Sequence, residues 1–330
     1  MSEMRPRPLL RTADLSKRYR VGRSPFPSQR RVVHAVEQVS LDIFPGETLG
    51  IVGESGCGKS TLGRCLVRLT DITSGSLEFE GQNITNSSQR QLRPLRRQMQ
   101  MVFQDPSASL NPRRRVGDLL ADPFRVHETL SRSEIMDRVE ELLRRVELLP
   151  EHAMRFPHEF SGGQRQRIVI ARALALHPRL IVADEPVSAL DVSIQAQIVN
   201  LLADLRDAFN LTYVFIAHDL SVVRQVSSRV AVMYMGSIVE EGPTDAVFAS
   251  PRHHYTAALR SAVPTPSVER QPTRRIVLEG DLPSPINPSS GCRFHTRCAA
   301  ATSMCREVRP TLTVTAQGHF VACHHPRANE

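Results

Sequence analysis

The chain has 330 residues, with 41% hydrophobic and 5% aromatic residues and a formal net charge of +8 at pH 7. A globular protein of this size can bury one large core and a small appendage. No apolar run approaches the roughly 20 residues of a membrane-spanning helix, and the first residues lack the apolar centre of a signal peptide. We therefore expect a chain that does not cross a membrane and stays in the cytosol.

The positive charge is concentrated near the end of the chain. Residues 251–330 contain ten Arg and five Asp or Glu, which leaves a net charge of +5 there and +3 elsewhere. A basic segment of this kind can bind nucleic acid, contact an anionic membrane surface or offset negative charge nearby. Because aromatic residues are few and Trp is absent, we expect no nucleic-acid partner. A solvated basic face is the simplest alternative.

Residues 9–50 predict an antiparallel layer of strands. Val39, Leu41 and Ile43 alternate with polar residues, as in a half-exposed strand. Turn-forming residues interrupt the segment at Gly22, Pro25, Pro27 and Pro45-Gly46. Tyr19 follows two basic residues and is a candidate for stacking on a nucleotide base, with core packing as the alternative.

A glycine-rich segment joins an apolar strand at 48–52 to a helix predicted at 62–69. It fits the P-loop pattern G-x-x-x-x-G-K-[ST] and reads Gly53-Glu54-Ser55-Gly56-Cys57-Gly58-Lys59-Ser60-Thr61. The glycines allow backbone N–H groups to turn inward, while the helix N-terminus and Lys59 add positive charge. The segment is therefore predicted to bind a nucleotide phosphate chain, with Ser60 offering its hydroxyl to Mg²⁺. A chance glycine-rich turn is the alternative.

The next segment predicts a helical lobe. A hairpin strand at 75–80 and a strand at 100–103 precede it, and Gln104 stands at the exit of the second strand. Between residues 105 and 160 the pattern is helical, and Ser131 with Glu134 forms a capping box ahead of an apolar helical face. We expect a semi-independent helical subdomain at about 105–160.

Two further apolar strands are predicted at 180–183 and 213–217. The first ends in Asp184-Glu185 and the second in His218, with a helix of crossover length between them. This order is that of a doubly wound α/β sheet, which places its ligand at the carboxyl ends of the parallel strands. A closing hairpin is expected at 230–239.

A second helix N-terminus is suited to an anion. The residues Ser161-Gly162-Gly163-Gln164 open a helix that is predicted to stop near Pro178. One triphosphate has little use for two such sites in a single chain. We therefore expect this segment and the P-loop to face different nucleotides.

With these motifs in this order, the sequence resembles the ATP-binding cassette (ABC) ATPases over nearly its whole length. The ordered set comprises the P-loop, Gln104, Ser161–Gln164, Asp184-Glu185, Ser188-Ala189-Leu190-Asp191 and His218. It departs from the common pattern at Val187, where most cassette proteins have Thr. Four segments resemble the dipeptide and oligopeptide importer branch, and within it the F-type subunit: Ser109–Arg113, Leu282–Pro288, Gly291–Phe294 and Val321–His324.

The resemblance implies a P-loop cassette α/β core at 1–250 with an antiparallel β layer and a helical subdomain, and a small Cys-containing domain at 251–330. It implies that Glu185 polarises the attacking water, that His218 contacts the γ-phosphate and that Gln104 takes part in catalysis. Magnesium contacts fall to Ser60, Gln104 and Asp184. ATP contacts fall to Tyr19, Gly53, Ser55, Gly56, Cys57, Gly58, Lys59, Ser60, Thr61, Gln104 and Asp184. Contacts to a partner subunit's nucleotide fall to Ser161, Gly162, Gly163, Gln164 and Asp191.

The resemblance also implies partners. These are a second, related ATPase subunit, two integral membrane permease subunits and, indirectly, an extracytoplasmic substrate-binding protein. The chain would lie peripherally at the cytoplasmic face of the inner membrane and couple ATP hydrolysis to import of dipeptides or oligopeptides. Import of another small solute, such as a nickel complex, stays open. A soluble cassette ATPase acting on ribosomes or nucleic acid is a further alternative, although that class usually has tandem cassettes or long coiled coils.

Four of the six cysteines cluster near the C-terminus. They are Cys292, Cys298, Cys305 and Cys323, separated by five, six and seventeen residues. A reducing compartment disfavours disulfides, and the spacing lacks the paired C-x₂-C of structural zinc sites. We predict that they bind a [4Fe–4S] cluster, with zinc or free buried thiols as alternatives. The local excess of Arg would offset the thiolate charge, and the cluster would cross-link a proline-rich domain with little core of its own.

Overall fold

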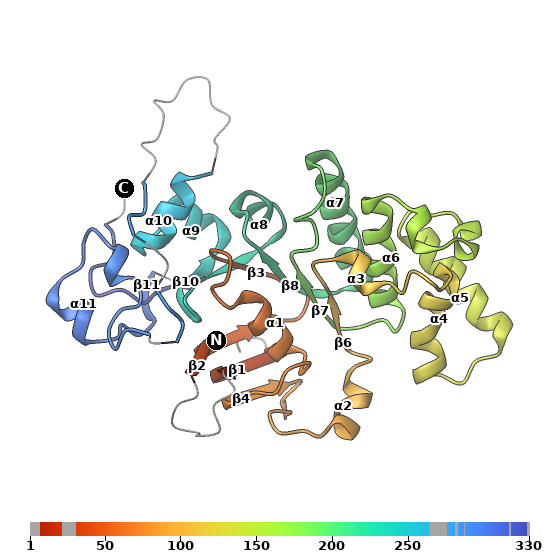
Figure 1. Cartoon of the computed structure of the whole chain (residues 1–330), viewed down its shortest axis with the longest axis horizontal. Coiled ribbons are helices and arrows are strands. Elements are labelled where there is room, and N and C mark those ends of the chain that lie inside the picture. Colours follow the sequence, from red (N-terminus) through yellow and green to blue (C-terminus); the bar gives the residue numbers. More distant parts are fainter. Residues whose placement is uncertain are drawn as a thin grey trace, which may run out of the picture. The chain divides into compact units, whose positions relative to one another are not determined.

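The computed structural model describes residues 7–21, 31–263, 276–280, 283–286, 288–316 and 318–328. The chain divides into two compact units. Figure 1 labels the helices and strands. The first unit comprises Met1–Ile43, Thr48–Asn86 and Ala217–Glu330, and the second comprises Phe44–Glu47 and Ser87–Ile216. Some sequence features lie outside the described residues: Gly22, Pro25, Pro27, Leu282 and Asn287.

An antiparallel sheet in the first unit confirms the predicted strand layer. Its strands are ordered β2-β1-β4-β5, and Leu10 of β1 pairs with Ile43 of β2. Val39, Leu41 and Ile43 are buried, as their alternation predicted. The bounds are Leu10–Val21 for β1, Arg31–Ile43 for β2, Ser74–Phe79 for β4 and Gln82–Asn83 for β5.

A second group of strands in the first unit has the order β11-β12-β10-β9-β3. Strand β3 is parallel to β9, while β9, β10, β12 and β11 pair antiparallel in succession. All five residues of β3 are buried, as expected for a strand covered on both faces. The bounds are Thr48–Val52 for β3, Arg229–Tyr234 for β9, Ser237–Pro243 for β10, Thr313–Ala316 for β11 and His319–Val321 for β12.

The helices of the first unit are short. They are α1 (Lys59–Leu66), α8 (Leu220–Val226), α9 (Thr244–Ala249), α10 (His254–Ser261) and α11 (Ser303–Glu307), with a 3₁₀ turn, η4, at His295–Arg297. Helix α8 packs closely on β3 at Gly50. A Cβ atom there would lie 2.3 Å from a methyl group of Val223, so the close approach requires glycine.

The second unit contains three parallel strands in the order β8-β7-β6. Helix α7 connects β7 to β8, which confirms the predicted order of strand, helix and strand. The bounds are Met99–Val102 for β6, Leu180–Asp184 for β7, Val192–Phe209 for α7 and Thr212–Ala217 for β8. Every residue of β7 and β8 is buried, so the polar residues that follow them emerge at the end of an apolar layer.

The helical part of the second unit follows the expected pattern. Helices α4, α5 and α6 lie side by side (Figure 1) and share an apolar core that includes Phe124, Val139 and Leu143. The capping box at Ser131 is present, with Glu134 N–H donating to Ser131 Oγ at 3.3 Å and Ser131 N–H donating to the Glu134 carboxylate at 2.7 Å. The helices are α2 (Gln89–Leu95), α3 (Pro106–Ser109), α4 (Val116–His127), α5 (Arg132–Arg145) and α6 (Gly162–Leu174), with 3₁₀ turns η2 (Pro150–Met154) and η3 (Pro157–Glu159). Among the described residues, no helix is both long and apolar enough to cross a membrane.

Candidate nucleotide site

The P-loop connects β3 to α1 within the first unit. Gly53, Gly56 and Gly58 all have positive φ, at 155°, 79° and 105°. A Cβ atom would lie 2.1 Å from the Met233 carbonyl oxygen at Gly53 and 2.0 Å from the Ala35 carbonyl oxygen at Gly58. Both positions therefore require glycine for space as well as for conformation. At Gly56 nothing lies within 4 Å, so only its conformation favours glycine.

Lys59 is folded along the loop. Its side chain is buried, and Nζ donates to the carbonyl oxygens of Gly53 at 2.7 Å and Glu54 at 3.0 Å. Helix α1 has no acidic residue in its first turn, so the positive potential of its N-terminus is not offset there. The loop thus presents a lysine and a helix N-terminus together, which suits a phosphate group.

The remaining predicted contacts of the P-loop differ in exposure. Ser55 and Gly56 are exposed, and Ser60 and Thr61 are half-buried. Cys57 is buried, and burial raises the pKa of its thiol, so the side chain is a neutral packing group. Tyr19 is 37% exposed, with Lys17 Nζ 4.9 Å from its ring centroid. Its predicted stacking on a base stays a prediction.

The predicted catalytic pair meets in the second unit. Gln104 Nε2 donates to Glu185 Oε2 at 2.9 Å, and Asp184 is buried at the end of β7. Glu185 has a positive φ of 48°, and its N–H donates to the Ile216 carbonyl oxygen at 2.9 Å. A left-handed conformation at a non-glycine residue is strained and persists where its surroundings enforce it. The turn after β7 sets the direction in which the Glu185 side chain leaves the backbone, and the hydrogen bond from Gln104 holds its carboxylate.

His218 follows β8 directly and is exposed. The next residue, Asp219, caps α8 by accepting a hydrogen bond from Ser221 N–H at 2.7 Å. The start of α8 therefore sets the position of the His218 backbone. The predicted contact of His218 with the γ-phosphate stays a prediction.

The second helix N-terminus has the expected form. Ser161 Oγ accepts from Gln164 N–H at 3.3 Å, and Gln164 Oε1 accepts from Ser161 N–H at 3.0 Å, which makes a capping box at the start of α6. No acidic residue lies in the first turn of α6. A Cβ atom at Gly163 would lie 2.6 Å from a methyl group of Ile194, so glycine allows the close approach of α7. Asp191, at the start of α7, is exposed.

Sequence reasoning missed the surroundings of Glu54 in the P-loop. Both carboxylate oxygens of Glu54 accept hydrogen bonds from Arg297, at 2.8 and 3.2 Å. The Glu54 N–H donates to the Tyr255 hydroxyl at 2.8 Å. The P-loop pattern places no constraint on residue 54, so no local signal pointed to these contacts.

The four C-terminal cysteines line one small pocket, together with histidines that include His253 and His295. Burial is the main cause that raises the pKa of the thiols of Cys292, Cys298 and Cys323, and neighbouring cysteines contribute to the rise; the pKa of Cys323 is raised to about 11. The structure thus brings the four residues together. Within the described part of the chain, however, no group of three or more His, Cys, Asp or Glu side chains is arranged to hold a metal ion. The side-chain geometry does not support the predicted iron–sulfur cluster.

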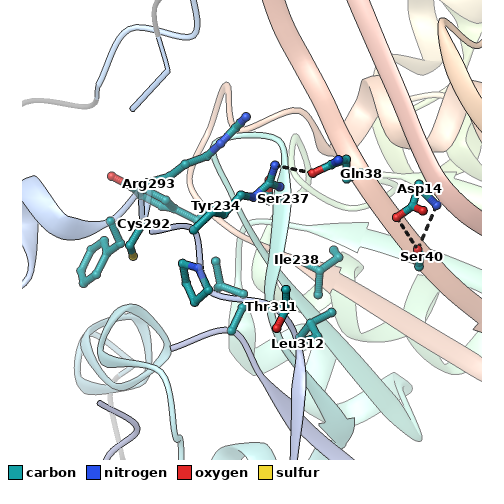
Figure 2. Close-up of a pocket in the computed structure, with 15 residues that line it drawn as sticks. Asp14, Gln38, Ser40, Tyr234, Ser237, Ile238, Cys292, Arg293, Thr311 and Leu312 are labelled. Atoms are coloured by element: carbon teal, nitrogen blue, oxygen red, sulfur yellow. Dashed lines mark hydrogen bonds between the residues drawn. The ribbon is translucent and has the colours of Figure 1, made fainter. Parts of the chain in front are cut away.

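A separate cavity of about 430 Å³ lies between β2, β10 and the C-terminal residues around Thr311 (Figure 2). Arg309 lines it and donates to Gln38 Oε1 at 2.7 Å and to Ser237 Oγ at 2.8 Å. Arg293 donates to the Met235 carbonyl oxygen, and burial lowers the pKa of its guanidinium to about 10. None of the described P-loop residues lines this cavity. Its contacts hold the C-terminal residues against β2 and β10.

The sequence matches two families and many individual proteins. The family described as ABC transporter matches residues 36–188, and the C-terminal region of oligopeptide/dipeptide transporters matches residues 239–305. The oligopeptide transport ATP-binding protein AppF of Bacillus subtilis (strain 168) is 53% identical over 321 residues, covering 96% of this chain and 97% of that protein. The di/tripeptide transport ATP-binding protein DppF of Pseudomonas aeruginosa (strain UCBPP-PA14) is 50% identical over 318 residues, covering 96% and 97%.

Solved structures agree with these matches. The dimeric structure of a post-hydrolysis state of the ATP-binding cassette MJ0796, bound to ADP and Pi, has a TM-score of 0.63 and 30% identity. The match covers 71% of this chain and 98% of that one. The fold, the ordered site residues and the near full-length identity agree, and the chain belongs to the ABC-transporter ATPases, in the branch of the oligopeptide and dipeptide transport ATP-binding proteins.

Proposed function

We propose that this ATPase energises the import of dipeptides or oligopeptides across the cytoplasmic membrane. The observation that carries the proposal is the match beyond the cassette. Residues 239–305 match the C-terminal region of oligopeptide/dipeptide transporters, and the full-length relatives are named for oligopeptide and di/tripeptide transport. A soluble cassette ATPase acting on ribosomes or nucleic acid does not account for that region.

In this proposal the site residues share the work of binding the phosphates and activating water. Lys59 offsets charge on the β- and γ-phosphates, and Glu185 accepts a hydrogen bond from the attacking water. Ser60, Gln104 and Asp184 would hold Mg²⁺, which when bound neutralises charge on the same phosphates. The hydrogen bond from Gln104 to Glu185 supports these roles, because it fixes the orientation of the carboxylate before substrate arrives.

The competent site is composite in this proposal. Ser161, Gly162, Gly163, Gln164 and Asp191 contact the nucleotide held by a second, related ATPase subunit, and His218 contacts the γ-phosphate of the chain's own nucleotide. Two observations support a dimer. Helices α1 and α6 each offer an N-terminus without acidic residues in the first turn, and the similar cassette MJ0796 is described as dimeric.

The assembly follows from the same proposal. Two integral membrane permease subunits would carry the substrate, and an extracytoplasmic binding protein would deliver it to them. The chain would then sit peripherally at the cytoplasmic face of the inner membrane. The transport proteins named among its relatives support this arrangement.

We also propose that Cys292, Cys298, Cys305 and Cys323 ligate a [4Fe–4S] cluster with a structural role. Support comes from their shared pocket and from the sequence spacing. It does not come from the side-chain geometry, because the four side chains as placed form no metal-binding group. Metal ligation requires deprotonated thiols, so binding of the cluster would release the protons that the raised pKa values keep on Cys292, Cys298 and Cys323. Anaerobic purification with about four iron and four labile sulfide per chain is the expected result. Stoichiometric zinc, or no metal at all, would contradict the cluster.

Uptake in a strain lacking the gene tests the transport proposal. We expect that strain to lose uptake of labelled dipeptides or oligopeptides, and the wild-type chain to restore it. Lys59→Ala should fail to restore uptake although the protein is present. Loss of nickel uptake with peptide uptake intact would instead favour the other solute class.

A further inference from the structure

An ion pair joins the P-loop to the cysteine segment, which we define as residues 292–323. Arg297 Nη1 and Nη2 donate to the two carboxylate oxygens of Glu54 at 2.8 and 3.2 Å. The side chains are 8% and 24% exposed, so water screens the pair only weakly. We propose that Arg297 is a positioning residue for nucleotide binding, which neutralises Glu54 and holds the P-loop through it.

Glu54 is held on three sides. Its carboxylate accepts from Arg297, its N–H donates to Tyr255, and its carbonyl oxygen accepts from Lys59 Nζ at 3.0 Å. A displacement of Glu54 therefore moves a carbonyl that orients the lysine of the P-loop. Glu54 therefore links Arg297 to Lys59, the residue that is proposed to offset charge on the phosphates.

Arg297 is itself well fixed. The backbone N–H of Arg297 donates to the Phe294 carbonyl oxygen at 3.0 Å in the turn η4. The Phe294 side chain is 2% exposed, and its ring packs against Tyr234 and Tyr255 with centroid separations of 5.3 and 5.5 Å. Tyr255 also accepts the hydrogen bond from Glu54 N–H. The packing of Phe294 on Tyr255 and the ion pair of Arg297 therefore both hold Glu54 in place.

The positive charge of Arg297 should affect ATP binding in a way that packing alone would not. Glu54 places a carboxylate in a loop that binds a polyanion, and an uncompensated negative charge there repels the phosphates. Arg297 offsets that charge with a bidentate contact. Loss of the arginine should therefore weaken ATP binding, and removal of the Glu54 charge in the same molecule should restore it.

Equilibrium titration of the full-length chain with a fluorescent ATP analogue at fixed salt tests this inference. Arg297→Gln should raise Kd about 3-fold to 30-fold, the range typical of coupling through a contact network. The double variant Arg297→Gln/Glu54→Gln should recover most of that loss. Arg306→Gln is the matched control, because Arg306 lies in the same segment with an exposed side chain. It should bind as the wild type does.

Two results would overturn the inference. One is a Kd for Arg297→Gln within about twofold of the wild type, a difference too small to indicate coupling. The other is a loss that Glu54→Gln does not restore, which would indicate packing alone. If Arg297→Gln does not fold, Arg297→Lys decides. Lysine gives up the bidentate contact but keeps the positive charge that offsets Glu54, so Kd should stay within about threefold of the wild type, and a larger loss contradicts the proposal. The inference deepens the proposed function: a wild-type chain that binds no analogue would contradict that function, whereas an unaffected Arg297→Gln variant contradicts only the role of Arg297.

Discussion

Glu185 and Gln104 are the residues on which the proposed chemistry depends most. Their side chains share a hydrogen bond of 2.9 Å, and Glu185 has a left-handed backbone conformation. Glu185→Gln keeps the size and the hydrogen-bonding capacity of the side chain but removes the base. It should leave ATP binding intact and lower turnover by about 10²-fold to 10⁴-fold. Normal hydrolysis by this variant, assembled with its partner subunits, would show that Glu185 is not the base.

Alanine substitutions at Gly53 and Gly56 can be compared within the same loop. Ala at position 56 meets no atom within 4 Å and adds only the strain of a positive φ, about 1–2 kcal/mol. Ala at position 53 also places Cβ 2.1 Å from the Met233 carbonyl oxygen, so backbone must move. Gly53→Ala should therefore lower the free energy of unfolding more than Gly56→Ala does. Urea denaturation of both variants checks this order, and equal losses would contradict the described path of the loop.

The sequence was informative at the residue scale wherever chemistry is encoded locally. The P-loop, Gln104 and Asp184-Glu185 are marked by short patterns at strand ends, and the structure brings Gln104 and Glu185 together as expected. The contact of Arg297 with Glu54 joins residues 243 positions apart. No periodicity or motif encodes such a pair, because it depends on how the C-terminal residues pack.

At the scale of elements, short buried strands were predicted well and their partners were not. The apolar run at 48–52 coincides with β3, because turn-forming residues bound it on both sides. Helix α1 differs from its predicted range of 62–69: it runs Lys59–Leu66, and Arg68 follows with a left-handed φ of 52°. Pairing of β12 with β10 was not foreseen. A side-chain contact accompanies it: Glu240 of β10 is fully buried and accepts a hydrogen bond from His319 Nε2 of β12 at 2.8 Å.

His253, the N-cap residue of α10, should make stability depend on pH. Burial lowers the pKa of His253 to about 4, against an ordinary value of 6.5. The unfolded chain therefore binds a proton at His253 that the folded chain does not, and stability falls as pH drops from about 6.5 to 4. The expected loss is about 3 kcal/mol.

Urea unfolding of the wild type and of His253→Gln between pH 4 and 8 measures this effect. The wild type should lose stability towards pH 4 more steeply than the variant, which lacks the titrating ring. His254→Gln is the neighbouring control and should keep the wild-type slope. Identical slopes for the wild type and His253→Gln would show that His253 is not held neutral.

At the scale of the whole molecule, the proposed composite site limits what one chain can do alone. Ser161 and its neighbours are assigned to the nucleotide of a second ATPase subunit, so an isolated chain lacks half of each site. The purified chain should hydrolyse ATP slowly, and addition of the related subunit should raise the rate while sedimentation shows a dimer. Full activity from a demonstrably monomeric preparation would contradict the composite site.

The most direct measurement of the central claim is peptide-stimulated ATP hydrolysis by the assembled transporter. The chain would be reconstituted in liposomes with its related ATPase subunit, the two permease subunits and the substrate-binding protein. We expect the hydrolysis rate to rise when di- or oligopeptides are added, and the rise to disappear when Glu185→Gln replaces the wild-type chain. Hydrolysis that does not respond to any peptide, yet responds to another solute or to nucleic acid, would contradict the assignment to peptide import.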